Sequence, residues 1–210
     1  GRLNFTGDYY IRDTKDMLTT SLTLPDVFGA KTPKANCANL RTKGWEITLS
    51  WQDEFQLAGS PFSYNVSASV GDYITKITKY HNPDRLISDH YVGKTLGEIW
   101  GYHVEGLFKT DREAAEYQAK IDDKAVNNRV YQCKGPAGNY LRAGDVRFAD
   151  LDGDNVISEG SGTVDDPGDK RIIGNSLPRY NYSFRVGFNW MGFDVSAFFQ
   201  GLGRRDWYPA

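Results

Sequence analysis

The sequence predicts a mainly β protein built from antiparallel strands, with one short helix in a long loop. Four runs alternate apolar and polar residues with the period of two that a strand requires. Aromatic residues make up 14% of the chain, and its 22 glycines supply turns. A single capping box, Thr110-Asp-Arg-Glu113, marks the start of a helix.

The first half of the chain contains three of the expected strands. Residues 3–11 alternate, and residues 18–42 are expected to form a long connection because they contain Pro25, Gly29 and Pro33. Alternation returns over residues 45–52 and 62–70, separated by the turn sequence Ala58-Gly-Ser-Pro61. These two runs predict an antiparallel hairpin.

The middle of the chain is less regular. Residues 80–97 are polar and irregular, and residues 99–108 are expected to form another strand. The capping box, with Ala114, Tyr117 and Ile121 at helical spacing, predicts a helix over residues 111–122. Residues 124–142 have the composition of a loop.

The last two expected strands alternate over residues 180–190 and 193–199, with a turn at Met191-Gly192. Phe198 is the exception, because it falls on the polar face of its run. Alternation alone fits two architectures. In a soluble β-sandwich the apolar face packs on a core, whereas in an outer-membrane barrel it meets lipid and the polar face lines the interior. Runs of about ten residues and aromatic residues near their ends favour the barrel. Soluble sandwiches are common and also use aromatic residues in their cores, so the pattern alone leaves both architectures open.

Composition excludes several functions. A net charge of −2 offers no basic surface for nucleic acid. The two cysteines, Cys37 and Cys133, do not make a disulfide framework or a zinc site, although one bridge is possible. No signal peptide or long apolar helix is expected in this stretch. The three scattered histidines and the absence of hydrolase motifs indicate that the chain is not an enzyme.

An acidic loop follows Phe148. Asp150, Asp152 and Asp154 alternate as positions 1, 3 and 5 of an EF-hand-type loop do, and Val156 stands where a backbone carbonyl ligand is expected. Ile157 takes the apolar position, and Asn155 replaces the usual glycine. Position 12 is Ser161, so a later carboxylate must close the site, with Asp165, Asp166 and Asp169 as candidates.

Hard oxygen donors without histidine or cysteine favour Ca²⁺. The sequence therefore predicts a structural calcium site at Asp150, Asp152, Asp154, Val156 and, as the closing carboxylate, Asp169. The alternative is a solvated acidic turn, because Asp, Asn and Gly favour turns without any metal.

The chain resembles the SusC/RagA-type TonB-dependent outer-membrane transporters. The matching stretches follow the family's order and are residues 9–17, 40–51, 97–102, 106–108, 144–154, 168–175 and 192–201. The family's acidic loop commonly reads Asp-x-Asn/Asp-Gly-Asp-Gly with a later Asp, a pattern on which Asp150, Asp152, Asp154 and Asp169 fall. An insertion around residues 159–167 and Asn155 depart from it.

The resemblance implies that residues 1–210 are a fragment of a barrel of about 22 strands, including the calcium-type loop at 150–174. The plug, the TonB box and the final strands are expected outside this stretch. The implied function is TonB-energised uptake of glycans or peptides across the cell outer membrane, together with a SusD-like lipoprotein. The alternative from a different class is a secreted, calcium-stabilised β-sandwich that binds carbohydrate, with Trp45 or Trp100 stacking on sugar rings.

Overall fold

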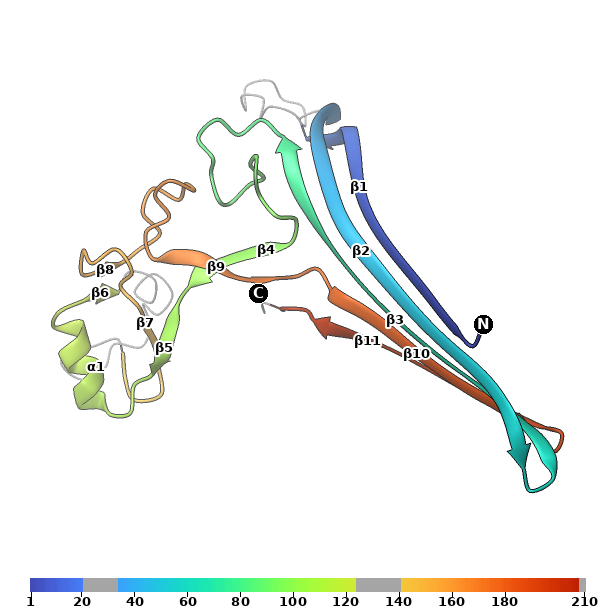
Figure 1. Cartoon of the computed structure of the whole chain (residues 1–210). Coiled ribbons are helices and arrows are strands. Elements are labelled where there is room, and N and C mark those ends of the chain that lie inside the picture. The colour runs from blue at the N-terminus through green and yellow to red at the C-terminus, as the bar shows by residue number, and fades with distance from the viewer. Residues whose placement is uncertain (21–33, 124–140, 208–210) are drawn as a thin grey trace. The chain divides into compact units, whose positions relative to one another are not determined.

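The computed structural model describes residues 1–20, 34–123 and 141–207. These residues fall into two compact units (Figure 1). Of the described residues, unit 1 comprises 1–20, 34–81, 92–97 and 175–207, and unit 2 comprises 82–91, 98–123 and 141–174. Cys133 lies outside the described residues, so a bridge between Cys133 and Cys37 stays a prediction.

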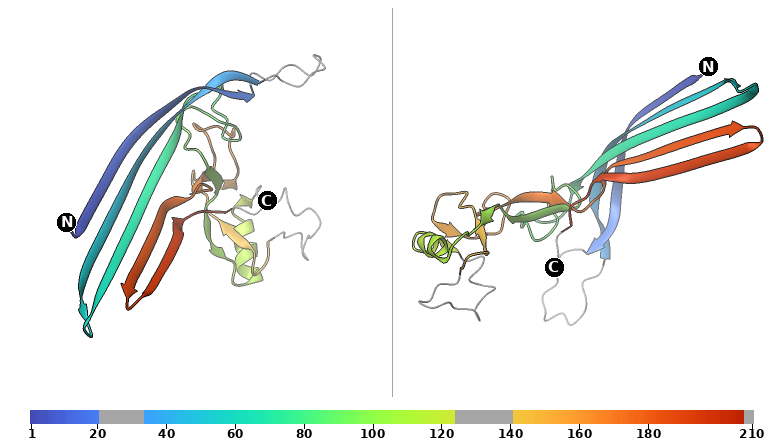
Figure 2. Two further views of the ribbon diagram at one scale, coloured as in Figure 1. Left: turned by 90° about the vertical axis from the view of Figure 1, so that its right-hand side faces the viewer. Right: turned by 90° about the horizontal axis from the view of Figure 1, so that it is seen from below.

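Unit 1 is a five-stranded antiparallel sheet in the order β1-β2-β3-β10-β11. Figure 2 shows its long strands running side by side and bending together. The strands are β1 (Leu3–Thr20), β2 (Lys34–Leu57), β3 (Ser60–Lys79), β10 (Arg179–Trp190) and β11 (Phe193–Arg204). The mainly β, antiparallel prediction is confirmed, including the hairpin of residues 45–52 and 62–70.

Two tight turns join the hairpins of unit 1. Ala58 and Gly59 have φ of 50° and 80°, and Met191 and Gly192 have φ of 49° and 82°. Positive φ at both central residues is the type I′ geometry, whose twist matches that of paired strands. The turns therefore fix the register of β2 on β3 and of β10 on β11.

The predicted connection over residues 18–42 is wrong at both ends. Strand β1 continues to Thr20, and β2 begins at Lys34. The extended parts carry polar residues on both faces, so they lack the alternation by which strands are detected. Asp16, with φ of 54°, lies at a register shift between Thr14 and Met17, which further disturbs the pattern.

The two faces of the sheet differ in chemistry as the sequence predicts. Register places Leu49 of β2 beside Phe5, Ala68 and, through β3, Phe184. Large apolar side chains of this face stay accessible: Phe5 is 64% exposed and Phe199 is 59% exposed. The opposite face carries hydroxyl groups that meet across the strands. We call these two surfaces the apolar face and the polar face.

Unit 2 is built from short strands and one helix. Strand β4 (Glu98–Tyr102) pairs with β9 (Lys170–Asn175), β5 (Val104–Leu107) with β7 (Val146–Phe148), and β6 (Asp122–Asp123) with β8 (Val156–Ile157). The expected strand at 99–108 is thus two strands, separated at His103, because its halves pair with different partners. Buried Phe108, Ala114 and Leu141, packed against Tyr117, form a small core.

Helix α1 (Asp111–Gln118) is shorter than the predicted 111–122. The N–H groups of both Lys120 and Ile121 donate to the carbonyl of Tyr117, and the chain then enters β6. The Thr110 hydroxyl accepts from the N–H of Glu113 at 3.1 Å, as a capping box requires. The Glu113 carboxylate instead accepts from Lys109, one residue before the expected amide.

None of the helical segments in the described residues is long and apolar enough to cross a membrane.

Candidate functional site

The acidic loop of unit 2 lies between β7 and β9. Its backbone turns sharply, with positive φ at Gly153 (80°) and at Asn155 (64°). Asparagine tolerates this conformation better than most residues, which explains its place in the loop. The Asp150 carboxylate accepts from the N–H groups of Gly153 at 2.7 Å and Asn155 at 2.9 Å, so the turn is closed by its own first residue.

Three of the predicted ligands converge in the loop. Carboxylate oxygens of Asp150, Asp152 and Asp169 lie within 4.8 Å of one another. Asp169 has no exposed surface, and it accepts from the N–H groups of Leu151 at 2.6 Å and Ser158 at 2.9 Å. It therefore bridges the two ends of the loop from a position distant in sequence.

The other two candidates for the closing carboxylate have different partners. Asp165 forms an ion pair with Arg85 at 2.9 Å. Asp166 accepts from the N–H of Ser161 at 2.9 Å, and this backbone hydrogen bond lowers the pKa of its carboxyl group. Neither belongs to the converging group, whereas Asp169 does.

The remaining predicted ligands occupy the next turn of the loop. One oxygen of Asp154 accepts from the N–H of Val156 at 2.7 Å, and Asp154 lies outside the converging group. Val156 begins β8 and is in register with Asp122 of β6. Ile157, at the position expected to anchor the loop, is completely buried. The participation of Asp154 and Val156 stays a prediction.

The loop is a region of concentrated negative charge. Tyr117 of α1 donates its hydroxyl to the carbonyl of Phe148 at 3.0 Å, beside the start of the loop. Burial raises the pKa of this phenol, and nearby carboxylates raise it further; these belong to Asp123, Glu105, Asp150 and Asp169. A site with this many carboxylates favours a cation and disfavours further negative charge.

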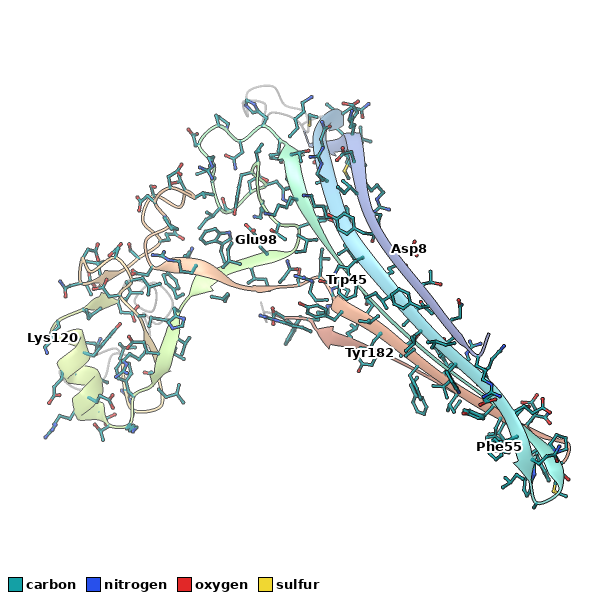
Figure 3. The ribbon with its side chains drawn as sticks, in the orientation of Figure 1. Asp8, Trp45, Phe55, Glu98, Lys120 and Tyr182 are labelled. Carbon is teal, nitrogen blue, oxygen red and sulfur yellow. The ribbon has the colours of Figure 1, made fainter. Side chains whose placement is uncertain are left out.

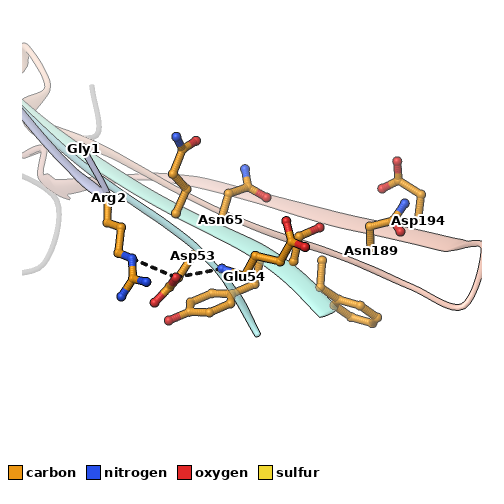
Figure 4. A pocket seen from close by; sticks show the side chains of 11 residues that line it. Gly1, Arg2, Asp53, Glu54, Asn65, Asn189 and Asp194 are labelled. Carbon is orange, nitrogen blue, oxygen red and sulfur yellow. Dashed lines mark hydrogen bonds and ion pairs between the residues drawn. The ribbon is translucent and has the colours of Figure 1, made fainter. Parts of the chain in front are cut away.

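The polar face of the sheet is a second candidate region. Hydroxyl groups pair across strands, Ser50 with Ser67 at 3.1 Å and Ser69 with Ser183 at 2.7 Å. Near the tight turns this side opens into a pocket of about 620 Å³ lined by polar groups such as Glu54, Asn65 and Asp194 (Figure 4). Figure 4 also shows the ion pair of Arg2 with Asp53, at 3.0 Å.

The apolar face ends in aromatic side chains. Near the tight turns, Phe55 and Phe62 have ring centroids 5.1 Å apart, and Trp51 donates to the hydroxyl of Tyr64 at 3.0 Å. Toward the other end, Trp45 is in register with Tyr9 and with Asp72. Figure 3 labels Trp45, Phe55 and Tyr182 along the strands of the sheet.

Sequence reasoning missed two polar arrangements. Arg179 at the start of β10 makes a bidentate pair with the nearly buried Asp72 of β3. In unit 2, Tyr91 and Trp100 both donate to the carboxylate of Glu98. These partners are distant in sequence or lie in irregular segments, so no spacing rule could have identified them. The indole N–H of Trp100, a candidate sugar-stacking residue, is thus engaged within the protein.

No protein-family model matches the chain. TonB-dependent receptor P3 of Formosa agariphila is 24% identical over 212 aligned residues, which cover 95% of this chain and 18% of the receptor. The solved structure of the RagAB peptide transporter matches with a TM-score of 0.54 at 17% identity, covering 95% of this chain and 19% of that one. The RagAB peptide importer in its closed-closed state matches with a TM-score of 0.56 at 17% identity, covering 96% and 19%.

The chain therefore spans about a fifth of the length of the relatives that it matches. It shares its fold with the solved structures of the RagAB transporter. The resemblance to SusC/RagA-type TonB-dependent transporters that the sequence indicates is confirmed by these matches. The relatives are a receptor and a transporter by name.

Proposed function

We propose that this chain is part of the barrel wall of a SusC-like, TonB-dependent transporter in the cell outer membrane. The apolar face meets lipid in this proposal, and the polar face lines the interior. The observation that carries it is the apolar face itself. Strand register places its large side chains on one side of the sheet, and many of them stay exposed, from 38% for Trp51 to 70% for Phe193. A β-sandwich, the alternative, would cover such a face with a second sheet.

The height of the apolar face supports the membrane assignment. On β2 it extends from Trp45 to Phe55, ten residues apart. At about 3.3 Å per residue this is about 33 Å along the strand, and the usual tilt of about 40° reduces it to about 25 Å. That is the height of the lipid-facing band of outer-membrane barrels, which aromatic girdles bound at both edges. Asp53, near the lower edge, is paired with Arg2.

The transported substrate would be a glycan or a peptide. The solved neighbours are named as a peptide transporter and importer, and the polar face offers hydroxyl, amide and carboxylate groups of the kind that contact either. The partners in this proposal are TonB, which supplies energy, and a SusD-like lipoprotein. The chain has a role in transport and not in catalysis.

Site-directed labelling of the full-length parent protein tests the proposed wall. Phe184 and Ser183 are neighbours on β10 and lie on opposite faces. In intact outer membranes, a cysteine in Phe184→Cys should react with a lipid-soluble reagent and be protected from a water-soluble one. Ser183→Cys should show the opposite preference. Equal labelling of both variants by the water-soluble reagent would reject the membrane wall.

The acidic loop is proposed to hold a structural Ca²⁺. Asp150, Asp152 and Asp169 would supply carboxylate oxygens, and Asp154 and the carbonyl of Val156 would complete the set. The support is the convergence of the three carboxylates and the burial of Asp169, since a divalent cation relieves their mutual repulsion. A bound ion would tie the end of β7 to the start of β9.

Calorimetry on the intact parent tests the calcium proposal. Calcium should bind to the wild-type protein with measurable heat. Asp150→Ala should lower the affinity for calcium by a large factor. Asp165→Ala is the matched control, because Asp165 belongs to the same loop but pairs with Arg85. The same heat in all three proteins, or none in the wild type, would leave only a solvated acidic turn.

A further inference from the structure

The apolar face changes character beyond the row of Tyr9 and Trp45. Strand register places two further rows above it, away from the tight turns: Ile11, Lys43 and Ile74, and then Asp13, Arg41 and Lys76. Apolar and cationic side chains are therefore interleaved on one surface. Lys43 and Lys76 are exposed, and so is Ile74, at 39%.

This surface carries an excess of positive charge. Arg41 donates to both carboxylate oxygens of Asp13, at 2.6 and 2.9 Å. Among the described residues, neither Lys43 nor Lys76 has a carboxylate partner. Asp72 in the row below does not neutralise them, because it is nearly buried and bonded to Arg179. Two lysine charges are thus available to an anion.

The surface is also hollowed. A groove of about 600 Å³ lies here, and its lining includes Lys43, Ile74, Lys76 and Val92. Val92 and Gly93 complete the lining, and their segment is fixed to β3 by backbone hydrogen bonds. The N–H of Gly93 donates to the carbonyl of Ile77 at 2.8 Å, and the N–H of Ile77 donates to the carbonyl of Lys94 at 3.0 Å. Val92, 52% exposed, adds apolar surface beside the lysines.

The turns of the sheet indicate which side of a membrane this end would face. The two tight turns, at 58–59 and 191–192, lie at the other end of the strands. In outer-membrane barrels the short turns are periplasmic and the long loops extracellular. In the proposed barrel wall, on which this inference rests, the groove lies at the outer edge of the lipid-facing band. Lipid headgroups of the outer leaflet occupy that depth.

We propose that this groove binds the phosphorylated headgroup of an anionic lipid. Lys43 and Lys76 contact the phosphate, because an ammonium group is a strong point-charge partner for phosphate oxygens. Ile74 and Val92 contact the first carbons of the acyl chains. Tyr9 and Trp45 lie one row lower, at the depth where aromatic side chains are enriched in membranes. The combination of free cations with exposed apolar groups distinguishes a lipid from a small soluble anion.

Native mass spectrometry of the full-length parent in detergent tests the groove. Phosphatidylglycerol and phosphatidylcholine with identical acyl chains serve as the anionic and the zwitterionic probe. The wild type should retain phosphatidylglycerol preferentially. Each lysine contributes roughly fivefold to the affinity for an anionic lipid, so Lys43→Gln/Lys76→Gln should weaken this binding about twentyfold or more. Lys43→Arg/Lys76→Arg should keep the preference.

The matched control is Arg12→Gln. Arg12 is exposed and in register with Thr42, so it lies at the same height on the polar face. Its replacement should leave lipid binding unchanged. Unchanged phosphatidylglycerol binding in the double glutamine variant, or equal retention of the two lipids by the wild type, would overturn the proposal.

Inorganic phosphate provides a further arm. If millimolar phosphate displaced bound phosphatidylglycerol as effectively as additional lipid does, the groove would be a site for a free anion, and the lipid assignment would be overturned. The membrane wall and the lipid groove fail separately. Loss of the labelling contrast between Phe184→Cys and Ser183→Cys rejects the membrane wall, whereas an unchanged lipid count in the double variant rejects the groove alone.

Discussion

The sheet of unit 1 and the loop structure of unit 2 treat their apolar residues in opposite ways. The sheet has strands of 12–24 residues and leaves Phe5 and Phe199 more than half exposed. Unit 2 has strands of 2–6 residues and buries Phe108 almost completely. The described part of the chain thus leaves large apolar side chains uncovered in one region and packs them into a core in the other.

The largest effect that would sharpen this contrast is expected in the core of unit 2. Phe108 is 2% exposed and its ring lies 5.1 Å from that of Tyr117. Phe108→Ala should destabilise unit 2 by about 3–5 kcal/mol, through lost burial and the cavity left behind. Hydrogen exchange of the parent protein should speed up in α1 and β7 and stay unchanged in β2 and β3.

Leu107→Ala is the control for that substitution. Leu107 is the preceding residue and is 59% exposed, so its truncation should change exchange in unit 2 little. Equal effects of the two substitutions would show that unit 2 does not depend on its own core.

The sheet should respond to charge and not to truncation. Val66 lies on the apolar face between Trp51 and Val186, and its neighbour Ser67 lies on the polar face. Val66→Arg should cost about 2–4 kcal/mol in a lipid-facing position near the midplane, and Ser67→Arg far less. The fraction of parent protein that assembles in the outer membrane should fall only for Val66→Arg. Equal tolerance would erase the proposed difference between the faces.

The next effect is a loss of stability of unit 2 at alkaline pH. Burial, together with a hydrogen bond to Glu98, raises the pKa of Tyr91 to about 12. Below about pH 10 the phenol is protonated in both the folded and the unfolded state, so its contribution does not change there. Between pH 10 and 12 the phenol of the unfolded state loses its proton first. The folding equilibrium constant of unit 2 should therefore fall by up to tenfold for each pH unit.

Tyrosinate absorbance measures this titration as the difference between the wild type and Tyr91→Phe. The phenol that titrates in the wild type but not in Tyr91→Phe should have a pKa well above that of a free tyrosine. Unit 2 of Tyr91→Phe should lose less stability than the wild type as the pH rises above 10. A missing phenol that titrates near pH 10 would contradict the burial that the geometry assigns to Tyr91.

The smallest effect concerns the start of α1. Thr110→Ala removes the acceptor for the N–H of Glu113 and should destabilise the helix by about 1 kcal/mol. Exchange should increase in the first turn of α1. Thr110→Ser keeps the acceptor and should restore most of the protection, whereas identical exchange in both variants would mean that the cap does not stabilise the helix.

Period-two alternation identified the paired parts of β2, β3, β10 and β11, because each has one apolar and one polar face. It failed where β1 and β2 continue with polar residues on both sides. Backbone pairing maintains those segments, and pairing depends on the neighbouring strand and not on the local pattern. The division of residues 99–108 into β4 and β5 was invisible for the same reason.

The acidic loop shows what residue spacing can identify and what it cannot. Spacing pointed to Asp150 and Asp152, whereas Asp169 was predicted as the last carboxylate from three acidic candidates in the sequence. The structure distinguishes Asp169 by its burial and its two backbone hydrogen bonds, neither of which spacing encodes. The pair of Asp13 with Arg41 likewise arises from cross-strand register, and the pair of Asp72 with Arg179 joins residues that are distant in sequence.

The pairing of β3 with β10 has a consequence for the order of folding. Gly71 and Asn181 are in register, although most of unit 2 separates their strands in the chain. Closing a connection of roughly 100 residues costs about 3–4 kcal/mol more in chain entropy than closing a two-residue turn. The hairpins β2-β3 and β10-β11 are local and should form early, whereas β3 and β10 should pair last. We therefore expect the pairing of these two strands to be the slow step of assembly and the one most exposed to aggregation.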